Sequence, residues 1–156
     1  MPDAPIIDLE SDHFFMGEAL RQAARAFQAE EVPIGAVVVR EGRVIARAFN
    51  QVETLKDATA HAEMLAVTQA ENAVGDWRLN DCTIYVTKEP CPMCAGALVH
   101  ARLGRVVFGA ADPKVGVSLW TEAMAGANLN HTLEFAGGLL EAECREQLQG
   151  FFRRRR

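Results

Sequence analysis

Two short motifs, His61-Ala62-Glu63 and Pro90-Cys91-Pro92-Met93-Cys94, constrain the fold of this chain more than any other feature of its sequence. They offer one imidazole and two thiolates, which are ligands that zinc prefers, together with a nearby carboxylate. A structural zinc site uses four protein ligands, whereas a catalytic site uses three and leaves the fourth position for water. The motifs therefore predict a fold that brings His61, Cys91 and Cys94 to one point around a catalytic Zn²⁺.

The spacing within each motif predicts that it lies at the start of a helix. Residues two apart do not share a face in a helix interior, so His61 and Glu63 would diverge there. In a first turn the side chains lean toward the helix N-terminus, and a metal beyond that end is within reach of both. The same holds for Cys91 and Cys94. Two helix N-termini directed at one point also favour the ionised forms of thiols and water.

Glu63 is the candidate catalytic residue. Zinc lowers the pKa of water from about 16 toward about 7, and a carboxylate beside it can take the released proton and pass it on. This combination indicates hydrolytic chemistry.

Each motif alone has a simpler interpretation. A Cys-x-x-Cys pair can be a redox pair or half of a structural zinc knuckle, and a His-x-Glu occurs by chance in many helices. A structural zinc site would need a fourth protein ligand. None of the remaining candidates forms a second paired motif with zinc-finger spacing: Cys82, His100, His131 and Cys144. The catalytic interpretation is therefore favoured.

Length and composition predict one domain spanning residues 1–156, with residues 1–10 as a loose leader. The chain has no apolar run of about 18 residues and no basic start typical of a secretory signal, so we expect no membrane span and a cytoplasmic location. Four cysteines in 156 residues suit a reducing compartment. Cys82 and Cys144 are expected to be buried apolar residues.

The charge is unevenly distributed. A net charge of −5 argues against non-specific coating of nucleic acid, yet residues 153–156 are four arginines that directly follow Phe151 and Phe152. The tail is either a solvated end or a contact for RNA.

Hydrophobic periodicity predicts strands interleaved with helices. The helix that Ser11 caps should end near residue 30, with Met16, Leu20, Ala23, Ala24 and Phe27 on its apolar face. The helix from about residue 60 to 70 is apolar nearly all round, which predicts burial. The closing helix should present Leu139, Leu140, Cys144, Leu148 and Phe152. The predicted strands cover residues 36–39, 43–48, 83–87, 105–109 and 132–136, and the other predicted helices cover about 91–101 and 139–152.

These elements predict a three-layer α/β/α domain around a central five-stranded mixed sheet. The first two strands form a hairpin, whereas a helix separates strands 83–87 and 105–109 and makes them parallel. The second zinc motif then lies at the carboxyl end of strand 83–87, the usual position of a site on an open α/β sheet.

The two motifs resemble those of the zinc-dependent cytidine and deoxycytidylate deaminase family. Further segments are similar to the bacterial tRNA-specific adenosine deaminases and cover nearly the whole chain: Glu31-Val32-Pro33-Ile34-Gly35-Ala36-Val37, Thr59-Ala60-His61-Ala62-Glu63, Tyr85-Val86-Thr87, Glu89-Pro90-Cys91, Met93-Cys94-Ala95-Gly96-Ala97, Gly104-Arg105-Val106-Val107-Phe108-Gly109 and Phe151-Phe152-Arg153. The resemblance implies a cytidine-deaminase-like fold, one Zn²⁺ per subunit and a homodimer. It also implies deamination of adenosine to inosine at the wobble position of a tRNA anticodon stem-loop.

The resemblance also implies roles for residues outside the metal ligands. Asn50, otherwise a typical loop residue, would hydrogen-bond the nucleoside. Asp112 would lie near a ribose and Lys114 near a phosphate, in a loop predicted at residues 110–120. The backbone around Ala62 and Pro90 would hold the edge of the base. Contact of the chain end with RNA would involve Phe151, Phe152 and Arg153. From its position beside the thiolates, Glu89 is expected to orient the metal ligands.

Two other functions remain open from the sequence. Zinc ligands do not distinguish an RNA deaminase from a deaminase of a free base or nucleoside such as guanine or cytosine, although Lys114 and the chain end suit RNA. A non-catalytic zinc module that binds nucleic acid would have no need of Glu63.

Overall fold

The computed structural model describes residues 11–114 and 131–155. The expected leader at 1–10, most of the predicted loop at 110–120 and Arg156 lie outside these residues. The centre is a five-stranded sheet in the order β2-β1-β3-β4-β5. β1 pairs antiparallel with both β2 and β3, and β3, β4 and β5 are parallel. The strands are β1 Gly35–Arg40, β2 Arg43–Phe49, β3 Cys82–Lys88, β4 Arg105–Ala110 and β5 Glu134–Ala136.

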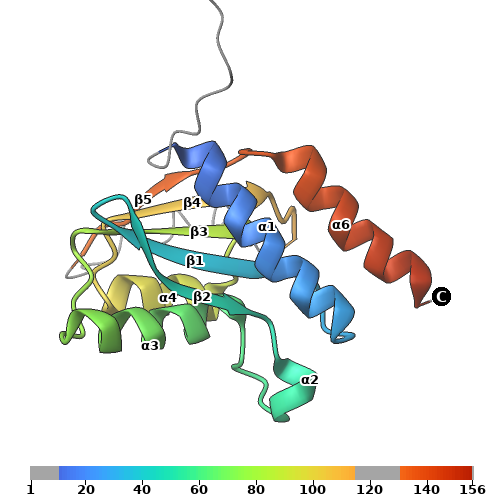
Figure 1. The fold of residues 1–156 in the computed structure, drawn as a ribbon, viewed down its shortest axis with the longest axis horizontal. Helices are drawn as coiled ribbons and strands as arrows, with labels where there is room; N and C mark the ends of the chain where they lie inside the picture. Colours follow the sequence, from blue (N-terminus) through green and yellow to red (C-terminus); the bar gives the residue numbers. More distant parts are fainter. Residues whose placement is uncertain (1–10, 115–130, 156) are drawn as a thin grey trace, which may run out of the picture.

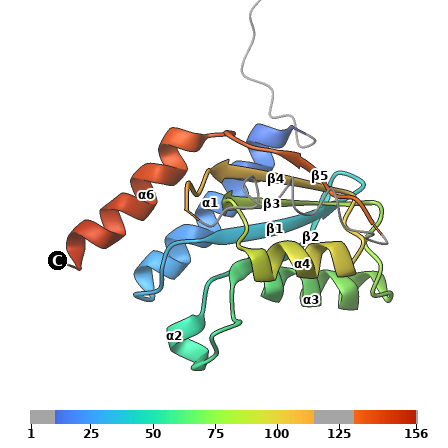
Figure 2. The same cartoon turned by 180° about the vertical axis from the view of Figure 1, so that it is seen from behind.

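Helices cover both faces of the sheet, which confirms the predicted three-layer fold. α1 and α6 lie on one face, and α3 and α4 lie on the other (Figure 1, Figure 2). The short α2 stands away from the sheet in both views. The helices are α1 Asp12–Gln28, α2 Val52–Leu55, α3 Ala62–Val74, α4 Pro92–His100 and α6 Glu141–Arg154. No helix of the described residues is long and apolar enough to span a membrane.

The apolar run in β1 is buried on both faces, as its sequence predicts. Val37 and Val39 join the core beneath α1, whereas Ala36 and Val38 join the core beneath α3. Gly35 begins the strand where α1 approaches most closely, since a Cβ there would lie 2.1 Å from the carbonyl oxygen of Ala19. A side chain at this position would push α1 off the sheet.

Several element boundaries differ from the predictions. Residues 49–59, between the predicted strand 43–48 and the predicted helix from about residue 60, contain the short helix α2. α3 is only half buried, with Thr68, Gln69, Asn72 and Ala73 exposed. Because α3 consists largely of small apolar residues, its hydrophobicity pattern does not show that one face of the helix is exposed to solvent. α6 begins at Glu141, two residues later than predicted, because Leu140 has a left-handed backbone with φ 52°. In α1 the buried face includes Phe15, Ala19 and Ala26, so the predicted stripe was offset around the helix.

The start of α1 is tied to the sheet through one carboxylate. Ser11 caps the helix by accepting a hydrogen bond from the backbone N–H of His13 at 3.1 Å, as predicted. Asp12 accepts hydrogen bonds from the Tyr85 hydroxyl at 2.6 Å and from both terminal nitrogens of Arg105 at 3.0 and 2.8 Å. The Arg105 guanidinium holds the pKa of Asp12 below its ordinary value.

We expect Asp12→Asn to destabilise the protein by about 1 kcal/mol at pH 7, a modest loss because the ion pair is partly exposed. A carboxylate with a lowered pKa stabilises the fold above its unfolded pKa, and this contribution disappears as the pH falls through the folded pKa. Denaturant unfolding at pH 7 and near pH 3 should therefore show a difference between variant and wild type that shrinks in acid. An equal difference at both pH values would exclude the ionic contribution.

Candidate metal centre and substrate pocket

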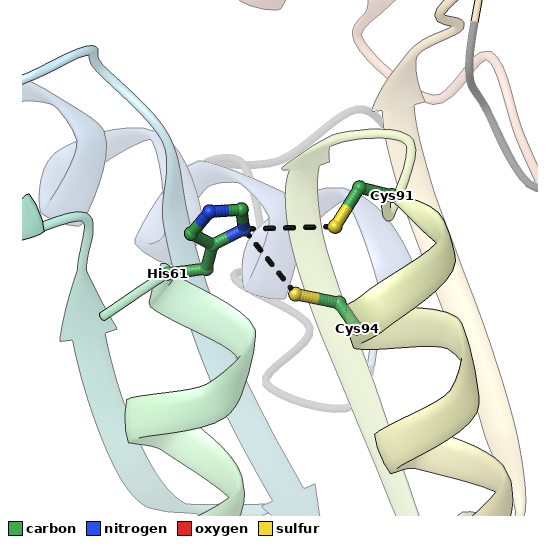
Figure 3. Close-up of side chains that lie close together, drawn as sticks. All are labelled: His61, Cys91 and Cys94. Atoms are coloured by element: carbon green, nitrogen blue, oxygen red, sulfur yellow. Dashed lines mark hydrogen bonds between the residues drawn. The ribbon is translucent and has the colours of Figure 1, made fainter. Parts of the chain in front are cut away.

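The four residues of the two zinc motifs lie at the starts of two helices, the arrangement that their spacing predicts. His61 is the N-cap of α3, and Glu63 lies in its first turn. Cys91 is the N-cap of α4, and Cys94 lies in its first turn. Figure 3 shows the His61 ring pointing at both sulfur atoms across the gap between the helices.

The distances within this cluster fit a tetrahedral zinc ion. The Nδ1 atom of His61 lies 3.6 Å from the Cys91 Sγ and 3.5 Å from the Cys94 Sγ (Figure 3). Zinc bonds of about 2.0 Å to nitrogen and 2.3 Å to sulfur place such ligands about 3.5 Å apart in a tetrahedron. All three ligand atoms lie within 4.8 Å of one another. The donor set and its geometry therefore suit a metal ion with three protein ligands.

The local electrostatics favour an anionic sulfur next to the imidazole. The hydrogen bond from Cys94, and next that from His61, lowers the pKa of Cys91 to about 4. The contact with Cys91 also raises the pKa of His61. Both shifts follow from a thiolate placed beside an imidazole, and a bound divalent cation would stabilise the thiolate and take the place of the imidazole proton.

Glu63 is buried beside the cluster. Its exposed fraction is 4%, and burial raises its pKa from 4.5 to about 7. A carboxyl group with this pKa can both accept and release a proton at neutral pH. Glu63 therefore has the environment required of a proton carrier.

A pocket of about 240 Å³ opens next to the metal ligands and is lined in part by His61, Ala62 and Asn50. Asn50 is 6% exposed, and its Nδ2 donates to the Val32 carbonyl at 3.3 Å. Its Oδ1 is buried with no hydrogen-bond partner among the described residues. A buried acceptor without a partner is costly, so a donor from a bound molecule is expected to satisfy it.

The loop after β4 is fastened to the segment that carries Cys91. Glu89 is 3% exposed, and its Oε1 accepts a hydrogen bond from the Asp112 backbone N–H at 2.8 Å. Asp112 also pairs with Lys88 at 3.1 Å and accepts from the Lys114 backbone N–H at 2.9 Å. Glu89 thus links the second zinc motif, which begins at the buried Pro90, to the loop that contains Asp112 and the exposed Lys114.

The end of α6 borders the same pocket through Phe151, which the sequence suggested, and through Arg155, but not through Phe152 or Arg153. Phe151 is 5% exposed and lines the pocket, together with Arg155, whose guanidinium stacks on the Phe151 ring at 4.7 Å. Phe152 is 48% exposed, so its predicted place on the buried stripe was wrong. Arg153 turns back to pair with Glu146 at 2.7 Å. The four-residue spacing of Phe151 and Arg155 is the helical signal that sequence reasoning missed.

The remaining two cysteines are structural, as predicted. Cys82 and Cys144 are both buried, and burial raises their pKa values to about 11 and 12. They remain protonated at neutral pH and serve as apolar side chains.

A mixed sheet with two helix starts that present His, Cys, Cys and a buried Glu defines a deaminase of the cytidine-deaminase-like class. The model of the MafB19-like deaminase family matches residues 10–156. A tRNA-specific adenosine deaminase from Bacillus subtilis (strain 168) is 49% identical over 146 residues, which is 93% of this chain and 91% of that protein. The chain belongs to the family of tRNA-specific adenosine deaminases.

Two solved structures place the chain within this class. One, from work on A-to-I editing by tRNA:A34 deaminases at the wobble position of transfer RNA, is 44% identical, with a TM-score of 0.82 over 86% of this chain and 99% of the other. The other, a guanine deaminase from Bacillus subtilis, is 32% identical, with a TM-score of 0.63 over 93% of this chain and 94% of the other. The chain is thus more similar to the RNA deaminase than to this free-base deaminase.

Proposed function

We propose that this protein hydrolyses adenosine to inosine at the wobble position of a tRNA anticodon. The observation that carries the proposal is the buried Glu63 beside a His-Cys-Cys cluster in a chain 49% identical to a tRNA-specific adenosine deaminase. The overall reaction consumes one water and releases one ammonia, so it needs no further reactant.

The metal would be Zn²⁺, one per subunit, held by His61 Nδ1 and by the sulfur atoms of Cys91 and Cys94. When bound, zinc supplies the Lewis acidity that makes water a nucleophile at neutral pH. The cluster already has the spacing of three tetrahedral ligands, so binding requires little rearrangement.

Glu63 carries the protons of the reaction. It accepts one from the water that attacks C6 of the purine and delivers it to N1. It then takes the remaining proton of the water from the new C6 hydroxyl and passes it to the amine, as C6 becomes a carbonyl, the C6–N bond breaks and ammonia leaves. Its pKa of about 7, raised by burial, suits a group that is protonated and deprotonated in each catalytic cycle.

The pocket residues orient the nucleoside. Asn50 Oδ1 is the acceptor available to the nucleoside, and the backbone around Ala62 and Pro90 would hold the edge of the base. Asp112 and Lys114 would contact the ribose and a phosphate of the RNA, on a loop that Glu89 fastens. The anticodon loop already presents unstacked bases, so no duplex has to be opened.

The end of α6 would extend this surface toward neighbouring nucleotides. The exposed ring of Phe152 is available for stacking on a base, and Phe151 borders the pocket. Arg153 is exposed, and its pairing with Glu146 can be exchanged for a phosphate.

We expect Asn50→Ala to reduce kcat/KM for an anticodon stem-loop by about 10- to 100-fold, because one well-placed hydrogen bond to substrate is lost. Bound zinc should stay at one per chain. Asn72→Ala, on the exposed side of α3, is the matched control and should behave as wild type. Equal activity of the Asn50 and Asn72 variants would show that the Asn50 side chain does not contact the nucleoside.

The substrate is tested by comparing three compounds at equal concentration: an anticodon stem-loop with adenosine at the wobble position, free guanine and free cytosine. The proposal predicts inosine and ammonia from the stem-loop and no ammonia from either free base. Ammonia from a free base alone would assign the protein to the other branch of the class.

We also propose that the protein is a homodimer in which both subunits contact RNA. Each subunit would be a single deaminase domain over residues 1–156, and the enzyme would act in the cytoplasm. Light scattering of the purified protein should give a mass near twice 17.1 kDa. A mass of one chain, both with and without stem-loop, would exclude the dimer.

A further inference from the structure

Glu31 is a buried carboxylate that the proposed chemistry does not use. It is 1% exposed, and its two oxygens accept hydrogen bonds from the backbone N–H of Glu53 at 3.0 Å and from the backbone N–H of Thr54 at 2.6 Å. The Thr54 hydroxyl donates a third bond at 2.5 Å. Burial opposes ionisation, but the bonds from Thr54 and Glu53 outweigh it and hold the pKa of Glu31 below its ordinary value.

The donors belong to the first turn of α2, which has no other side-chain cap. Gln51 occupies the N-cap position and makes no side-chain capping bond. Glu31 therefore supplies, from a segment distant in sequence, the anionic cap that a helix N-terminus favours. A helix of four residues is not stable alone, and α2 stands away from the sheet (Figure 1). The Glu31 carboxylate thus ties α2 to the segment that precedes β1.

The anchored segment forms a wall of the substrate pocket. Glu31, Val52 and Glu53 line the same pocket as His61. The segment begins at Asn50, whose backbone N–H donates to the Ile34 carbonyl at 3.0 Å, and it ends at His61. A shift of α2 would therefore change the width of the pocket, whereas Asn50 is held separately by its bonds to Ile34 and Val32.

We propose that Glu31 is a positioning residue: by fastening α2, it fixes the pocket wall against which the substrate nucleoside binds. This inference rests on the proposed function for its substrate. Glu31 does not touch the reacting atoms. Its loss should therefore weaken the binding of the substrate more than it slows the reaction of the bound substrate. The expected signature is a raised KM with a smaller change in kcat.

The central variant is Glu31→Gln, which keeps the size of the side chain but replaces one acceptor oxygen with an NH₂ group that faces N–H donors. With the stem-loop as substrate, KM should rise about tenfold, and kcat should change less than about threefold. Zinc should remain at one per chain. Hydrogen exchange of the backbone at residues 52–56 should accelerate about tenfold, and exchange in α3 should not change.

Three further variants make the test decisive. Thr54→Val removes only the hydroxyl donor and should raise KM by a few fold with little loss of stability; it decides the question if Glu31→Gln does not fold. Combining both changes should raise KM by less than the product of the single effects, because both act through one contact. Asp12→Asn replaces a carboxylate with an amide at the start of α1, outside the pocket, and should leave KM unchanged.

An unchanged KM in Glu31→Gln or Thr54→Val, or an equal rise in Asp12→Asn, would overturn the inference. If wild-type protein does not deaminate the stem-loop, the proposed function fails instead. The hydrogen-exchange result then still decides whether Glu31 fastens α2.

Discussion

Glu63→Gln should reduce inosine formation by about 1,000-fold or more while leaving zinc at one per chain. The amide has the size of the carboxyl group but cannot take a proton from water or return one to the leaving amine, and general acid–base catalysis is worth about 10² to 10⁴ in rate for each transfer. Single-turnover inosine formation on a stem-loop, with metal analysis of the same sample, measures both quantities. Glu71→Gln, in the same helix and partly exposed, is the matched control and should retain wild-type activity.

Glu63→Gln should also raise the free energy of unfolding of the metal-free protein at high pH. Burial raises the folded pKa of Glu63 to about 7, so its favourable contribution is complete below the ordinary value of 4.5 and is lost as the pH rises through about 7. At pH 8 the metal-free Glu63→Gln protein should therefore have a free energy of unfolding roughly 3 kcal/mol above that of wild type. A variant that is inactive because it misfolds would instead be less stable at every pH.

Cys94→Ser should lower bound zinc from one per chain to less than about a tenth and abolish deamination. A weakly acidic hydroxyl is a poor replacement for a thiolate in a tetrahedral site, and the two remaining ligands do not make a zinc site. Elemental analysis after dialysis against a mild chelator measures the metal, and thermal unfolding shows whether added zinc still raises Tm.

The matched control for this prediction is Cys144→Ala. Cys144 is equally buried but packs against Gly109, on the face of the sheet that α6 covers. The cavity should cost about 1 to 2 kcal/mol of stability and leave zinc unchanged. Loss of zinc in both variants would mean that general destabilisation, and not ligand chemistry, empties the site.

The sequence predicts the metal cluster well because coordination chemistry and helix geometry restrict it together. Side chains spaced by two or three residues, such as His61 with Glu63 and Cys91 with Cys94, can converge beyond the start of a helix, and His61 and Cys91 are indeed the N-cap residues. The sheet followed from β-branched runs such as β1, and its mixed direction followed from one hairpin and one intervening helix.

The pocket wall was less predictable, because no local signal reports long-range contacts. α2 has only four residues and is fixed by a carboxylate 22 residues earlier in the chain, so its own sequence does not indicate a helix. Phe151 and Phe152 are adjacent and equally apolar, and only the rotation of α6 against the sheet decides that Phe151 is buried. Both outcomes depend on tertiary packing, which overrides local preference.

The central claim, that a water activated at the His61-Cys91-Cys94 centre replaces the amine of a wobble adenosine, is tested most directly by isotope labelling. Zinc-loaded protein is incubated with an anticodon stem-loop in H₂¹⁸O, and the wobble nucleoside is then analysed by mass spectrometry. The expected product is inosine that carries one ¹⁸O, and none should form after the metal is removed. Unchanged adenosine at that position with fully loaded protein would contradict the claim.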